Sequence, residues 1–170
     1  MTSILLILTF FFTGGVIGIS DQNNDPVFEE RTSSFYFSNK EQKDNFKVYV
    51  LGDSYEDARL HLSVSTSDGR LLYSNSCGLY DMMLTQCDLE TMSKEEALKE
   101  LLDNYFHNSF SSPAIAKDHK YDTMYSSCSK EVWERLQKDE DIIGFCFALE
   151  HSGICIAYVD NQVIIYEACC

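Results

Sequence analysis

Two hydrophobic periods alternate along the chain, and together they predict an α+β fold. Apolar residues recur at every second position in Phe46 to Val50 and again in Leu60 to Val64. A period of two is typical of strands with one buried and one solvated face. Ser67-Asp68-Gly69 is a turn signal, because Asp-Gly suits positive backbone φ angles. Arg70 to Ser74 then completes a predicted antiparallel meander of three strands.

The middle of the chain changes to helical spacing. Ser93 and Glu96 have the spacing of a capping box, in which each side chain bonds the other residue's backbone amide. The stripe from Leu98 to Phe106 then predicts one long amphipathic helix. A Ser-rich, irregular stretch fills residues 108–128, and a short helix is expected from Lys130 to Gln137.

Three strands are expected at the C-terminal end, forming a second meander. They cover 141–149, 154–159 and 162–168, joined by a four-residue loop at 150–153 and a two-residue turn at Asp160-Asn161. Alternation of faces places the large side chains on one side: Ile143, Phe145, Phe147, Leu149, Ile154, Ile156, Val163 and Ile165. Small residues occupy the other: Gly144, Cys146, Ala148, Cys155, Ala157 and Ala168. We expect the helix that starts at Ser93 to cover this small-residue face.

Three segments of unequal character divide the chain. Residues 1–20 are predicted to be a cleaved signal peptide, since an apolar run ends in Gly18-Ile19-Ser20. A retained anchor and a buried N-terminal element are the alternatives, although the run is shorter than the roughly 20 residues that span a bilayer. Residues 21–34 are predicted to be a flexible leader, and 35–170 a single α+β domain. The expected location is therefore secreted or periplasmic.

Charge narrows the choice of partner. The chain has 27 acidic and 13 basic residues and a formal net charge of −14. Such a surface repels nucleic acid and anionic lipid and attracts cationic proteins. We therefore expect no nucleic-acid binding, and membrane contact only through an uncleaved N-terminal segment. Solubility alone is the other explanation of this charge.

Seven cysteines in an exported chain predict disulfides. The candidates are Cys87, Cys128, Cys146, Cys155, Cys169 and Cys170. The expected four-residue loop would set Cys146 and Cys155 diagonally, about 7–8 Å apart, which is at the limit for a direct bond. We therefore expect at least one bond between the C-terminal strands and the middle of the chain.

Catalysis has one candidate pair, Cys77 and His151. A cysteine hydrolase needs a thiolate beside an imidazole. The run from His151 to Tyr158, followed by Val163 to Glu167, resembles the histidine-bearing strands of papain-like peptidoglycan hydrolases. That family's Asp-Cys-Ser-Gly element is absent, since Cys77 lies in Ser76-Cys77-Gly78. No paired metal-ligand spacing and no nucleotide-binding or dinucleotide motif occurs, so neither a metal nor a cofactor is expected.

The segment His119 to Tyr125 is the predicted binding surface, with His119, Tyr121 and Tyr125 as its recognition residues. Long ordered loops are commonly functional, and exposed tyrosines often anchor partners. The leading hypothesis is a non-enzymatic exported domain that binds a cationic macromolecule, such as an inhibitor or immunity-type protein. The alternatives are the Cys77–His151 hydrolase and a structural component of the cell envelope.

Overall fold

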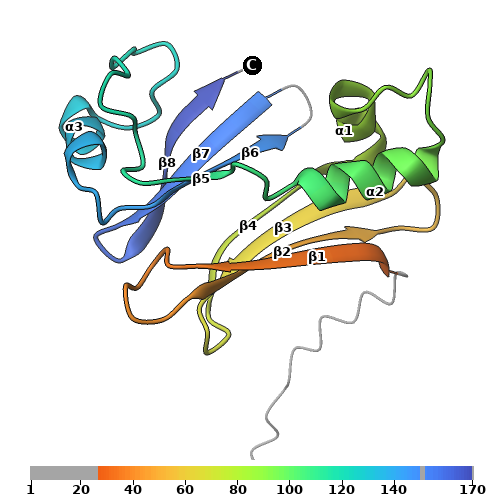
Figure 1. Ribbon diagram of the computed structural model, residues 1–170, viewed down its shortest axis with the longest axis horizontal. Helices are drawn as coiled ribbons and strands as arrows, with labels where there is room; N and C mark the ends of the chain where they lie inside the picture. Colours follow the sequence, from red (N-terminus) through yellow and green to blue (C-terminus); the bar gives the residue numbers. More distant parts are fainter. Residues whose placement is uncertain (1–26, 150–151, 170) are drawn as a thin grey trace, which may run out of the picture.

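Two antiparallel four-stranded sheets and three helices make up the described chain, which is residues 27–149 and 152–169 of a computed structural model (Figure 1). The α+β expectation is confirmed. The N-terminal sheet has the order β1 (Val27–Phe35), β2 (Asp44–Leu51), β3 (Arg59–Ser65), β4 (Leu71–Gly78). The C-terminal sheet has the order β5 (Phe110–Ser111), β6 (Gly144–Leu149), β7 (Ser152–Val159), β8 (Gln162–Cys169).

Strand β1 corrects the leader prediction, because residues 27–34 belong to it. It pairs antiparallel with β2. The sequence gives no sign of this strand, because an edge strand does not need alternating apolar residues. Polar side-chain contacts stabilise β1. Arg31 Nε donates to Asp103 at 2.7 Å, and Lys47 forms an ion pair with Glu30. The predicted signal peptide lies outside the described residues.

The main core lies on the inner face of the N-terminal sheet. The alternating residues are buried as their period predicts: Phe46, Val48, Val50, Leu60, Leu62 and Val64. They pack against Phe145, Phe147 and Ile156 of the C-terminal sheet, and the Phe46 and Phe145 rings meet with centroids 4.9 Å apart. The C-terminal sheet, α1 and α2 all lie over this same face in Figure 1. Both sheets therefore share one core.

Helix α2 (Lys94–Asn104) begins at Ser93 with both capping-box bonds in place, so this prediction is confirmed. Its apolar stripe is buried against α1 and β1. Helix α1 (Leu79–Gln86) follows β4 directly and was not expected. It has eight residues and no side-chain cap at Gly78, so Asp81 in the first turn is a weak start signal on its own.

Helix α3 (Lys130–Lys138) covers the small-residue face of the C-terminal sheet. The prediction that the Ser93 helix would do so is wrong, because that helix packs on the N-terminal half of the fold. Trp133 and Leu136 of α3 pack with Ala157 and Tyr166 in a second buried cluster. Trp133 is a large side chain, so a short helix suffices to fill this layer.

The β6–β7 hairpin has a tighter turn than expected. Leu149 pairs with Ser152, so the strands are joined by two residues and not by four. The shorter connection sets a different register from the expected one and brings Cys146 directly opposite Cys155. The β7–β8 turn at Asp160-Asn161 is confirmed, and both residues have positive φ angles of 53° and 63°.

A β-bulge interrupts the β7–β8 pairing. Ile156 pairs with Ile165, whereas Cys155 pairs with Glu167, which leaves Tyr166 as the extra residue. The bulge turns Glu167 toward the face that carries the cysteines and sets Ala168 opposite Ile154. The expected place of Ala168 on the small-residue face is therefore wrong. Ile165 is 39% exposed, because it lies on an edge strand beyond the shared core.

Candidate binding cleft

A cleft of about 910 Å³ lies between the helices and the C-terminal sheet. One wall consists of residues from α1, α2 and the segment that leads to Ser109. The other wall consists of β6, β7 and Glu167 of β8. Its size is in the range of pockets that hold small molecules or side chains of a partner.

Carboxylates are the only permanent charges that line this cleft among the described residues. Glu100 projects from the helical wall and Glu167 from the sheet wall, and no lysine or arginine lines either side. Of the residues that the structure describes, His107 is the one histidine in the lining. Glu100 forms no ion pair in the part of the chain that the structure describes. The cleft therefore favours a cation over an anion.

The rest of the lining combines apolar and neutral polar groups. Met82, Leu101, Phe147 and Ile154 supply apolar surface. Tyr105 also lines the cleft, and its buried hydroxyl has no hydrogen-bond partner among the residues that the structure describes. Burial raises the pKa of this phenol far above its ordinary value, so the hydroxyl stays protonated and able to donate. An apolar lining with a few polar groups is typical of binding sites.

The disulfide Cys146–Cys155 belongs to the sheet wall. The Cys146 backbone N–H donates to the Ser109 carbonyl at 2.8 Å, away from β7. Cys146 and Cys155 therefore form a non-hydrogen-bonded pair, the arrangement in which opposite Cα atoms approach most closely. The observed Cα–Cα distance is 4.0 Å. The covalent link fixes the end of the hairpin that borders the cleft.

Cys87 and Cys128 are thiols, so the expected bond between the C-terminal strands and the middle of the chain is not formed by them. The cause is the β6–β7 register, which lets Cys146 and Cys155 bond each other. Cys87 lines the cleft, where burial raises the pKa of its thiol and the Glu100 charge raises it further. Burial likewise raises the pKa of Cys128. The side chains of Cys169 and Cys170 lie outside the described residues.

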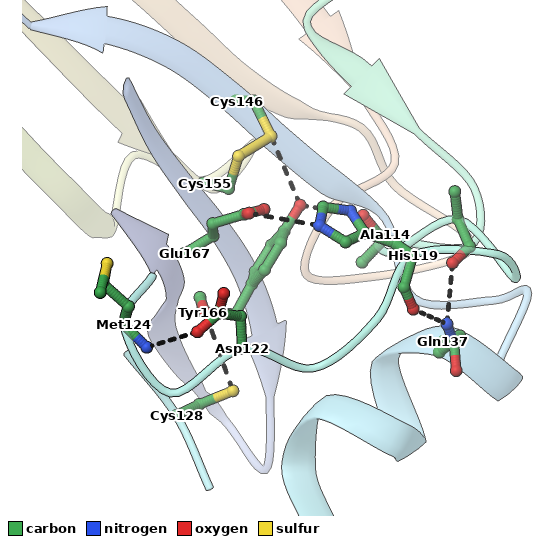
Figure 2. A network of polar contacts seen from close by, with 11 residues as sticks. Ala114, His119, Asp122, Met124, Cys128, Gln137, Cys146, Cys155, Tyr166 and Glu167 are labelled. Carbon is green, nitrogen blue, oxygen red and sulfur yellow. Dashed lines mark hydrogen bonds and ion pairs between the residues drawn. A yellow bond between two sulfur atoms is a disulfide. The ribbon is translucent and has the colours of Figure 1, made fainter. Parts of the chain in front are cut away.

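Glu167 connects the cleft to a polar network on β8 and α3 (Figure 2). Its carboxylate lies 3.6 Å from His119 Nε2. The neighbouring Tyr166 hydroxyl donates to the Ala114 carbonyl at 2.9 Å and lies 3.5 Å from Cys146 Sγ. Gly144 leaves room for that hydroxyl, since a Cβ at this position would lie 2.5 Å from it.

The predicted binding residues separate into two groups. His119 and Tyr121 both place their rings edge-on against Trp133, with centroids 5.4 and 5.7 Å away. Tyr121 also donates to the Cys128 carbonyl, so it chiefly fastens the loop to α3. Tyr125 is 44% exposed, and its carbonyl accepts from the Ala168 backbone amide beside Glu167. Tyr125 is therefore the loop tyrosine that a partner can reach.

The proposed catalytic pair gains no support from its surroundings. Cys77 is 4% exposed on β4, within the shared core. His151 lies outside the described residues, so the pairing stays a prediction. No group of three or more His, Cys, Asp or Glu side chains is placed to hold a metal ion within 27–149 and 152–169.

Sequence reasoning missed the two carboxylates of the cleft. Glu100 is one of several acidic residues on α2, and nothing in the local pattern distinguishes it. Glu167 sits in an apolar strand, which is a usable signal, because a lone carboxylate there needs a polar environment or an edge position. The face that it occupies depends on the bulge at Tyr166.

No protein-family model matches this chain, and no curated protein or solved structure matches it either. Among the described residues, no helix has the length and apolar character needed to cross a membrane. The class is therefore defined by the fold and the cleft: an α+β protein of two antiparallel sheets with a carboxylate-lined cleft at one end of the C-terminal sheet.

Proposed function

We propose that this chain is an exported, non-enzymatic binding protein whose cleft receives a cationic group of a partner protein. The observation that carries the proposal is the charge of the lining, which, within residues 27–149 and 152–169, includes Glu100 and Glu167 but no lysine or arginine. The formal net charge of −14 adds long-range attraction for a basic partner. An inhibitor or immunity-type protein directed at a cationic secreted enzyme fits these properties.

The exposed surface beside the cleft suits a protein better than a small molecule. Met124 and Tyr125 are exposed and lie next to the segment that pairs with Glu167. Their apolar surface can be buried once charge has brought the partner close. A lysine or arginine side chain has the required form, because it carries a charge at the end of an apolar stem.

The first test uses a capped lysine peptide, acetyl-Ala-Lys-Ala-Lys-Ala-amide, and its glutamine analogue. Binding is measured by NMR titration at low and at high salt. We expect the lysine peptide to bind more tightly than the glutamine peptide, and salt to weaken it by screening. Glu100→Gln and Glu167→Gln should each weaken binding about two- to fivefold, the range of single solvent-accessible ion pairs.

Glu41→Gln is the matched control, since Glu41 is exposed and lies outside the cleft. It removes the same charge and should leave the affinity nearly unchanged. Equal binding of the two peptides, or absence of binding by the lysine peptide at low salt, would contradict the proposal.

A further inference from the structure

Glu167 contacts both the cleft and the His119 side chain. It lines the cleft, and its carboxylate also pairs with the His119 imidazole (Figure 2). The Glu167 side chain is 22% exposed, so few water molecules compete for it. His119 does not line the cleft. The residue that connects His119 to a ligand in the cleft by direct contacts is therefore Glu167.

His119 is held in place by α3. The Gln137 side-chain amide donates to the carbonyls of His119 and Ala116, at 2.7 and 2.9 Å. The imidazole rests edge-on against Trp133. These contacts fix both the backbone and the ring, so the imidazole is positioned to face Glu167 before any ligand arrives.

We propose that Glu167 is the carboxylate that receives the ligand's cation and that protonated His119 is the counter-ion that the ligand displaces. This inference rests on the proposed function. An imidazolium neutralises Glu167 and competes with the ligand, whereas a neutral imidazole leaves the carboxylate available. Histidine changes charge between pH 5 and 8, so binding strengthens as the pH rises through this range.

The other charged groups near His119 do not act in the same way. Within its own segment, Lys117 forms an ion pair with Glu140, and Asp118 and Lys120 are exposed. The α3 residues that contact it, Trp133 and Gln137, are neutral. In the cleft, His107 also carries an imidazole that repels a cation in its charged form. The experiment must therefore separate the two histidines.

The experiment measures the affinity of acetyl-Ala-Lys-Ala-Lys-Ala-amide at about pH 5.5 and about pH 7.5, on either side of histidine titration. Wild type, His119→Gln and His107→Gln are compared. At the lower pH, His119→Gln should bind about two- to fivefold more tightly than wild type, because the competing ion pair is gone. At the higher pH the two should agree. His107→Gln should keep the His119-dependent part of the pH response.

A second measurement follows the His119 side-chain NMR signal during the titration. Since His119 lies outside the cleft, it should respond to the peptide in wild type and stop responding in Glu167→Gln. If the peptide binds but His119 does not respond, or His119→Gln keeps the wild-type pH dependence, displacement is overturned and the proposed function stands. If the wild-type protein binds no lysine peptide at either pH, both fall together.

Discussion

Burial and bonding place the cysteine residues in three chemical situations. Cys146 and Cys155 are joined in a disulfide. Cys87 and Cys128 are half-buried thiols whose pKa values are raised by burial, which lowers the fraction of reactive thiolate. Cys77 is enclosed in the core. The hydrolase alternative therefore places its nucleophile at the least accessible of the three thiols in the described part of the chain.

Alkylation by iodoacetamide tests this ordering. In the native protein, Cys87 and Cys128 should react first, and faster at higher pH, because their raised pKa values limit the thiolate near neutrality. Cys77 should react slower by a factor on the order of 100 or more, since its exposure requires the core to open. Peptide mapping by mass spectrometry identifies each site, and denatured protein is the control in which all three react.

Rapid native labelling at Cys77 would contradict the ordering and support the hydrolase alternative.

Among the elements, α2 links the helical wall of the candidate cleft to the edge strand β1. Its outer residue Asp103 bonds Arg31 of β1 and Lys99 of its own helix. These bonds hold the pKa of Asp103 below its ordinary value of 3.8. The bond from Lys99 has the larger effect and the bond from Arg31 the next largest. On the inner side, Glu100 faces the cleft. The same helix thus presents one carboxylate to β1 and another to the cleft.

Asp103→Asn tests whether the ion pairs of Asp103 stabilise the fold, because the two possible effects change the free energy of unfolding in opposite directions. A negative charge near a helix C-terminus is unfavourable to the helix dipole, so the dipole alone predicts that this change stabilises the protein. The ion pairs predict destabilisation. Because the folded-state pKa is lowered, their contribution is present above the unfolded value of 3.8 and disappears as the pH falls through the folded value.

Urea unfolding of Asp103→Asn should therefore show a deficit near neutral pH that shrinks as the pH falls below 3.8. Asp53→Asn, an exposed carboxylate outside these bonds, is the matched control and should show no such deficit. A variant that is more stable than wild type at neutral pH would show that the dipole outweighs the bonds.

At the scale of the whole molecule, one core serves both sheets, and the cleft opens where this shared packing ends. The N-terminal sheet is covered partly by helices and partly by the C-terminal sheet (Figure 1). The β6–β7 hairpin extends to the cleft, where the disulfide joins its two strands. The disulfide should therefore contribute both to stability and to the shape of the binding wall.

Replacing both cysteines, Cys146→Ser with Cys155→Ser, should lower the free energy of unfolding by about 2.5 kcal/mol, the chain-entropy value for so short a loop. The variant should also bind the lysine peptide more weakly, because β6 and β7 are then no longer linked covalently where they line the cleft. Cys128→Ser changes a thiol outside the cleft and is the control. Unchanged unfolding of the double variant in urea would rule out a stabilising disulfide.

The sequence by itself determined the elements whose evidence is local. The periods at Phe46 to Val50 and Leu60 to Val64, the Ser93 capping box and the Asp160-Asn161 turn each depend on neighbours within a few residues, and each is observed. Strand β1 and helix α1 were not predicted, because edge pairing and packing stabilise them rather than a pattern in their own residues.

Only the tertiary structure decided the cleft. A two-residue hairpin set Cys146 opposite Cys155, and a single bulge at Tyr166 turned Glu167 to their face. A shift of one residue in a strand reverses every side chain after it, so no local pattern fixes such an outcome. Net charge was readable from composition, whereas the placement of Glu100 and Glu167 around one cavity required the fold to set α2 and the C-terminal sheet on its opposite walls.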